Sequence, residues 1–123
     1  MADSIRVLVV DEDVDVLELT ATFLEREGDR ITVETEQTAA GALDRAGDFD
    51  CIVSDLRMPE MDGIELFEAI RDRGHEIPFF VFSAASDGDT TDRIREADVT
   101  GFVKKGAGTD HYTELAERIE QTA

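Results

Sequence analysis

Short apolar runs alternate along the chain with longer segments in which apolar residues recur every three or four positions. The runs have the length of strands, and they are Arg6 to Val10, Ile31 to Thr35, Cys51 to Ser54, Phe79 to Phe82 and Gly101 to Lys104. The first, third and fourth lack polar alternation, which is typical of strands covered on both faces in a parallel sheet.

The segments between and after these runs predict helices. In chain order they are Val14 to Leu24, Thr38 to Arg45, Ile64 to Ile70, Thr90 to Ala97 and Tyr112 to Ile119. We expect the first to end at Gly28 in the left-handed conformation that glycine favours. Gly41 weakens the second.

The resulting order is a strand followed by a helix, five times over. Such alternation with short connections predicts a parallel α/β sheet with right-handed crossovers and helices on both faces. A length of 123 residues suits a single domain, 1–123, with a core of about residues 4–121. Ligands of such sheets bind beyond the carboxyl ends of the strands.

The charge balance is strongly acidic, with 30 Asp and Glu against 12 Lys and Arg and a net charge of −18. Nucleic acid and anionic membranes are therefore excluded as direct partners, because both require a basic surface. The acids are spread over the chain and 41% of the residues are hydrophobic, which argues against a disordered tail. We hypothesise adaptation to high salt, where screening reduces the repulsion between carboxylates.

The chain shows no signal peptide and no apolar run near the roughly 18 residues that cross a bilayer. We therefore expect a cytoplasmic location. Its single cysteine, Cys51, lies in an apolar run and is interpreted as a small buried hydrophobe.

Polar side chains gather where the predicted strands end. The first strand runs into Asp11, Glu12 and Asp13. The third strand ends at Asp55, the fourth at Ser83 and the fifth at Lys104 and Lys105. Carboxylates about 4 Å apart repel by on the order of 4 kcal/mol at a dielectric of 20, so a cation is expected among them. Oxygen ligands favour Mg²⁺, and a metal-polarised phosphoryl donor beside a carboxylate is arranged for transfer to Asp.

Four motifs lie at these strand ends. They are Val-Leu-Val-Val-Asp-Glu-Asp at 7–13, Ser-Asp-Leu-Arg-Met-Pro-Glu-Met-Asp-Gly at 54–63, Phe-Val-Phe-Ser-Ala at 80–84 and Gly-Phe-Val-Lys-Lys-Gly at 101–106. With them the chain resembles the receiver domains of two-component response regulators over nearly its whole length. The resemblance implies a flavodoxin-like (βα)5 fold that acts as a phosphoacceptor switch, not as an enzyme. The last motif is similar to receivers that precede sensor and kinase domains in salt-loving archaea.

The resemblance also implies roles for individual residues. The phosphoacceptor would be Asp55, and the Mg²⁺ ligands Asp11, Glu12, Asp55 and the backbone carbonyl of Arg57. The switch and phosphate contacts would be Ser83, Phe102 and Lys105, whereas Lys104 would point to the opposite face of its strand. The family's usual proline after the lysine is replaced by Gly106, so we expect a differently shaped loop there.

The implied partners are a sensor histidine kinase or phosphotransfer protein and a downstream protein. The downstream protein would bind the face formed by the fourth helix, fifth strand and fifth helix of a monomer or weak homodimer. The domain would stand alone or belong to a larger hybrid sensor kinase. A phosphorylation-independent interaction module on the same fold is the alternative from another class.

Three other readings of the acidic segment fail on particular residues. A calcium-binding EF-hand needs Gly and Glu where Val16 and Thr22 stand. A haloacid-dehalogenase phosphatase needs Thr or Val where Asp15 stands. A flavodoxin-like flavin binder needs a phosphate loop rich in hydroxyls and glycine, and this chain has three acids there.

Overall fold

The computed structural model describes residues 4–84, 88–106 and 110–122. Its strands are β1 (Ile5–Val10), β2 (Ile31–Glu36), β3 (Cys51–Ser54), β4 (Phe79–Ser83) and β5 (Gly101–Lys104). Its helices are α1 (Val14–Glu27), α2 (Ala39–Arg45), the 3-10 turn η1 (Ala46–Asp48), α3 (Gly63–Asp72), α4 (Gly88–Ala97) and α5 (Asp110–Thr122). Each predicted strand and helix is therefore confirmed, with small shifts at the ends.

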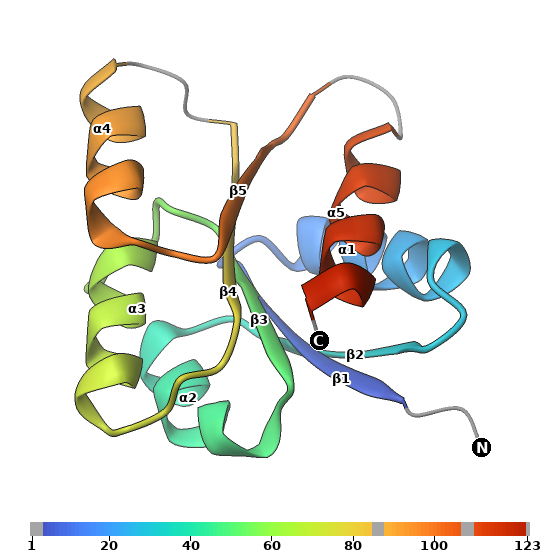
Figure 1. Ribbon diagram of the computed structural model, residues 1–123, viewed down its shortest axis with the longest axis horizontal. Coiled ribbons are helices and arrows are strands. Elements are labelled where there is room, and N and C mark those ends of the chain that lie inside the picture. The colour runs from blue at the N-terminus through green and yellow to red at the C-terminus, as the bar shows by residue number, and fades with distance from the viewer. Residues whose placement is uncertain (1–3, 85–87, 107–109, 123) are drawn as a thin grey trace.

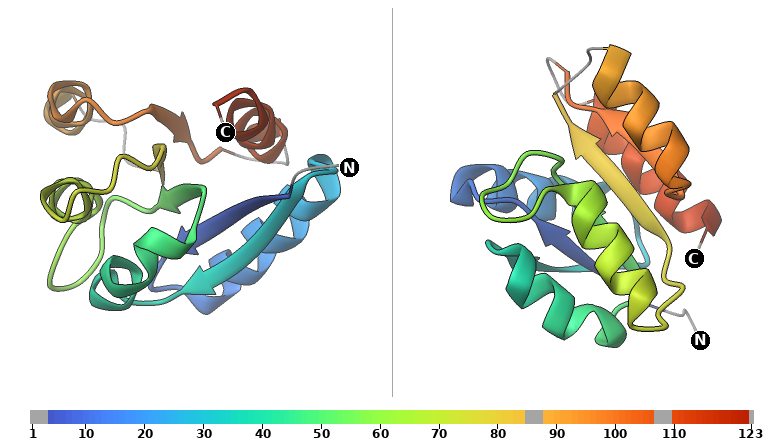
Figure 2. Two further views of the ribbon diagram at one scale, coloured as in Figure 1. Left: turned by 60° about the horizontal axis from the view of Figure 1, so that its bottom comes forward. Right: turned by 90° about the vertical axis from the view of Figure 1, so that its left-hand side faces the viewer.

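The strands form one parallel sheet in the order β2-β1-β3-β4-β5. Helices α1 and α5 cover one face, and α2, α3 and α4 cover the other (Figures 1 and 2). This is the predicted flavodoxin-like α/β fold. No helix within the described ranges has both the length and the apolar character needed to span a bilayer.

Each face of the sheet carries its own apolar core. The side chains of β3 and β4 are buried throughout, and those of β1 are buried except at Arg6. The absence of polar alternation in these three runs is thus explained by helices on both sides. Cys51 is fully buried, and this burial raises the pKa of its thiol to about 12, as expected of a structural cysteine.

Helix ends are set by local side chains. Asp13 accepts hydrogen bonds from the N–H groups of Asp15 and Val16 at the start of α1, and Asp62 forms a capping box with Glu65 at the start of α3. The prediction for Gly28 is wrong in its conformation, because φ is −114° and the backbone is extended. A Cβ there would lie 2.4 Å from Cδ1 of Ile31, so any other residue requires the Ile31 side chain to shift.

Thr20 on α1 provides a test of the core. Its side chain is fully buried, and its Oγ1 is the buried side-chain polar atom that lacks a hydrogen-bond partner within the described residues. Thr20→Val should raise the free energy of unfolding by about 1 kcal/mol, because a methyl replaces a hydroxyl that lost its water on burial. Urea denaturation measures the change, with the exposed Thr22→Val as the near-neutral control. A loss of stability in Thr20→Val would show that the hydroxyl has a partner in solution.

Candidate functional site

The candidate site lies at the carboxyl edge of the sheet, where β1 has β2 on one side and β3 on the other. Chain connections leave β1 in opposite directions at this point, which opens the crevice that ligands use in such sheets. Val10 pairs with Ser54, and the N–H of Asp55 donates to the carbonyl of Val10 at 2.9 Å. The strand pairing therefore places Asp11 and Asp55 beside each other, as predicted.

Lys105 joins these two carboxylates. Its Nζ lies 2.9 Å from Oδ2 of Asp11 and 3.8 Å from Oδ1 of Asp55. The side chain of Asp11 is 5% exposed and that of Asp55 16%, so the ammonium neutralises charge that water reaches poorly. Lys104 is exposed. The choice of Lys105 over Lys104 thus agrees with the geometry.

The Asp55 carboxylate has close polar neighbours. The N–H of Leu56 donates to Oδ1 at 2.8 Å, and the hydroxyl of Ser83 is near enough to lower the pKa of this carboxyl. Burial raises the pKa of Asp55 above its ordinary value, and the charge of Asp11 raises it further. Lys105, Leu56 and Ser83 lower the pKa and only partly oppose the burial.

The side chains of the predicted metal ligands do not form one cluster. Glu12 is exposed, and within the described ranges no three or more His, Cys, Asp and Glu side chains form a group that could hold a metal ion. At Arg57 the predicted ligand is the backbone carbonyl, which stays a prediction. The donors that are present nevertheless fit Mg²⁺, which typically takes one or two carboxylates and keeps several waters. Asp11 and Asp55 provide such a pair, and their charge is shared with Lys105.

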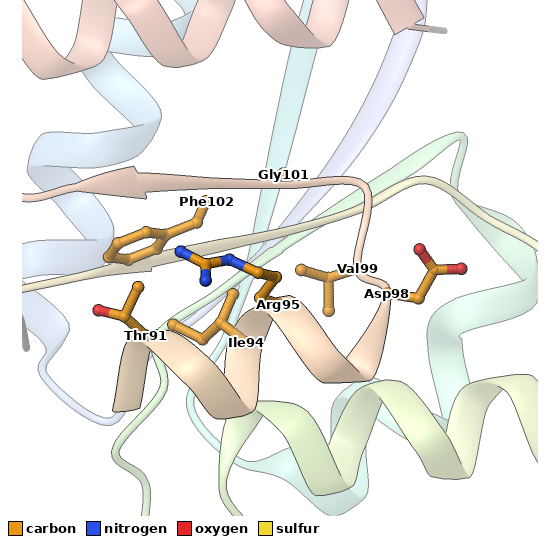
Figure 3. Close-up of a pocket in the computed structure, with 7 residues that line it drawn as sticks. All are labelled: Thr91, Ile94, Arg95, Asp98, Val99, Gly101 and Phe102. Carbon is orange, nitrogen blue, oxygen red and sulfur yellow. The ribbon is translucent and has the colours of Figure 1, made fainter. Parts of the chain in front are cut away.

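Phe102, the predicted switch aromatic, lies on the side of β5 that faces α4 (Figure 3). It is half-buried against the core under α2, α3 and α4. A pocket of about 310 Å³ opens beside it, lined by Thr91, Ile94, Arg95, Asp98, Val99, Gly101 and Phe102. An aromatic ring next to such a pocket has space to change its orientation.

The peptide bond between Lys105 and Gly106 is trans, and the described residues contain no cis peptide bond. The N–H of Gly106 donates to Nδ1 of His111 at 3.4 Å. A proline in place of Gly106 could not make this bond, because it has no N–H. The rest of the connection, residues 107–109, lies outside the described residues, so the predicted change in loop shape is not tested there.

Two contributors were missed by the sequence reasoning. Gly63 begins α3 directly against the acceptor, because a Cβ there would lie 2.5 Å from the carbonyl oxygen of Asp55. The glycine that ends the motif at 54–63 was a signal for this close approach. The second is His111, whose spacing from any acid or cysteine gave no signal of a role.

Comparison with known proteins identifies the family of this chain. The response regulator receiver domain family matches residues 7–118, and the chain belongs to this family. A protein-glutamate methylesterase/protein-glutamine glutaminase of a Nocardioides species is 38% identical over 122 residues, which cover 95% of this chain and 33% of that protein. The response regulator SaeR of Staphylococcus aureus is 29% identical over 80% of this chain and 42% of its own length.

Two solved structures share this fold. FixJ-N has a TM-score of 0.84 and 29% identity, covering 100% of this chain and 98% of its own. The chemotaxis response regulator CheY4 of Vibrio cholerae has a TM-score of 0.80 at 23% identity, covering 94% of this chain and 98% of its own. The chain spans less than half the length of the two curated relatives described above. Receiver domains of this family are phosphoacceptor switches.

Proposed function

We propose that this receiver accepts a phosphoryl group on Asp55 from the phosphohistidine of a sensor histidine kinase or a phosphotransfer protein. The observation that carries the proposal is the arrangement around one carboxylate. Asp55 accepts a hydrogen bond from Leu56, has Ser83 close enough to lower its pKa, and lies 3.8 Å from the ammonium of Lys105. Membership of the receiver family supports the same conclusion.

The chemistry follows from these groups. A carboxylate oxygen of Asp55 attacks phosphorus in line with the bond to the donor histidine nitrogen, which leaves with the bonding electron pair. Lys105 balances the charge of the acyl phosphate as a compact point charge, and the Ser83 hydroxyl donates to a phosphoryl oxygen. Asp11, Glu12, Asp55 and the carbonyl of Arg57 would hold Mg²⁺, which supplies positive charge to the transferring group.

The switch would act through Phe102, on the side of β5 that faces α4. A new dianionic group beside Ser83 draws this hydroxyl away from the carboxylate, and Phe102 fills the space toward β4. The surface formed by α4, β5 and α5 then changes its shape around the pocket beside Phe102. We propose that a downstream protein binds this surface.

A direct test measures covalent modification. The protein is incubated with Mg²⁺ and a small acyl phosphate, and its intact mass is recorded. We expect the mass of one added phosphoryl group in the wild type and in Asp92→Asn, an exposed control on α4, and none in Asp55→Asn. No added mass in the wild type, or an equal gain in Asp55→Asn, would defeat the proposal in favour of a phosphorylation-independent interaction module.

The acidic surface carries a second testable proposal, adaptation to high salt. A net charge of −18 favours expansion at low ionic strength, and at about 1 M salt the Debye length falls to about 3 Å. We expect the melting temperature, followed by circular dichroism, to rise between dilute buffer and molar KCl. Sucrose of equal osmolality is the control, because it is excluded from the protein surface but does not screen charge. An equal rise of the melting temperature in KCl and in sucrose, or no rise in molar KCl, would remove the proposal.

A further inference from the structure

His111, near the start of α5, holds the backbone that follows Lys105. Its Nδ1 accepts a hydrogen bond from the N–H of Gly106 at 3.4 Å. The N–H of Lys105 itself donates to the carbonyl of Ser83 at 2.9 Å. The peptide groups on both sides of the Lys105 α-carbon are therefore anchored, one to β4 and one to α5.

The ring of His111 also contacts the surface that supports the lysine side chain. It packs against Phe82 at 5.5 Å and against Tyr112 at 4.1 Å between ring centroids. The Nζ of Lys105 lies 5.4 Å from the centroid of the same Phe82 ring. Phe82 thus contacts both the histidine and the ammonium, so the imidazole and Lys105 lie on the same aromatic surface and the Gly106 hydrogen bond is made close to the ammonium.

We propose that His111 is a positioning residue for Lys105, acting through its hydrogen bond to the Gly106 N–H, and that it tunes the rate of phosphoryl transfer to Asp55. This inference rests on the function proposed above. Gly106 is part of the device, because proline at this position has no N–H to donate. The pair formed by Gly106 and His111 therefore replaces the proline that receivers commonly have after the lysine.

The contact is specific for the neutral imidazole. Nδ1 accepts a hydrogen bond while the ring proton is on Nε2, and a proton on Nδ1 removes the acceptor. Burial lowers the pKa of His111, the charge of Lys105 at the end of β5 lowers it further, and Asp110 on α5 opposes the shift. From β4 and α5 the ring also meets the aromatic rings of Phe82 and Tyr112. The hydrogen bond is accordingly present at neutral pH, and it is lost as the pH falls below the ordinary pKa of histidine.

Four variants separate the hydrogen bond from packing. His111→Asn keeps an acceptor and does not titrate, whereas His111→Phe keeps a ring without an acceptor. Gly106→Pro removes the donor, and Gly106→Ala retains it at a position where a Cβ meets no atom within 4 Å. We expect phosphorylation by acyl phosphate to slow about threefold to tenfold in His111→Phe and Gly106→Pro, the equivalent of one hydrogen bond. His111→Asn and Gly106→Ala should stay near the wild-type rate, and the double variant His111→Phe/Gly106→Pro should be no slower than either single one.

NMR gives a readout that needs no phosphorylation. In the unmodified wild type, the amide of Gly106 should titrate with His111, and the side-chain resonances of Lys105 should shift in His111→Phe but not in His111→Asn. A Gly106 amide that ignores His111, or Lys105 resonances unchanged in His111→Phe, would overturn the inference even if Asp55 is phosphorylated. If these couplings are present but no phosphoryl mass is added, the positioning of Lys105 stands and the proposed function fails.

Discussion

Lys105→Met is expected to lower the free energy of unfolding by about 3 kcal/mol in magnesium-free buffer. Lys105 lies 2.9 Å from Asp11, whose carboxylate is 5% exposed, and 3.8 Å from Asp55. Removing the ammonium leaves two adjacent, poorly hydrated carboxylates without their cation. Methionine retains much of the apolar stem over Phe82, so the loss reports on charge more than on packing.

Magnesium should restore much of this loss, because a cation that binds the folded state alone stabilises it by mass action. At a concentration of about 100 times its dissociation constant, such a ligand contributes about 2.7 kcal/mol. Urea denaturation of Lys105→Met and wild type, each with and without Mg²⁺, measures both effects. The increment from Mg²⁺ should be larger in the variant, because the metal no longer competes with the ammonium.

Lys104→Met is the matched control, since it removes the same charge from the neighbouring exposed position. Its effect should remain within about 0.5 kcal/mol. Equal losses in the two variants would mean that only net charge matters. An increment from Mg²⁺ that is the same in both variants would contradict a shared site for the metal and the ammonium.

The location of this site could be predicted because strand ends are strongly encoded in the sequence. The apolar runs that became β1 and β3 stop at Asp11 and Asp55, and parallel pairing brings the ends of adjacent strands to one edge. The last strand likewise ends at Lys104 and Lys105, and the resemblance of its motif singled out Lys105. These assignments needed only the periodicity of the chain and the resemblance of its motifs.

The remaining contributors depend on contacts between distant segments, which periodicity does not encode. Gly28 was expected to have a left-handed backbone. Its backbone is extended instead, and a side chain at this position would clash with Ile31. His111 was interpreted as structural, because its partners Gly106 and Phe82 become visible only after α5 packs beside β4 and β5. Glu12 follows Asp11 in the sequence, yet it is exposed in the structure while Asp11 is buried.

Gly63→Ala is expected to damage the fold and the acceptor together. A Cβ at Gly63 would lie 2.5 Å from the carbonyl oxygen of Asp55 and 3.2 Å from Cα of Leu56, and both are backbone atoms. The N–H of Gly63 also donates to the carbonyl of Leu56 at 2.8 Å, which ties the start of α3 to this segment. The segment must therefore move away from the helix or lose this bond.

We expect a loss of about 2 kcal/mol in the free energy of unfolding, typical of overpacking a rigid site. Phosphorylation of Asp55 should also slow, because its carboxylate is held by the N–H of Leu56 in the displaced segment. Gly88→Ala is the control: a Cβ there meets no atom within 4 Å, and alanine favours the start of α4. Equal stability of the two variants would show that the backbone at Asp55 yields without strain. A Gly63→Ala protein that is destabilised but phosphorylated at the wild-type rate would show that the start of α3 supports the fold without positioning the acceptor.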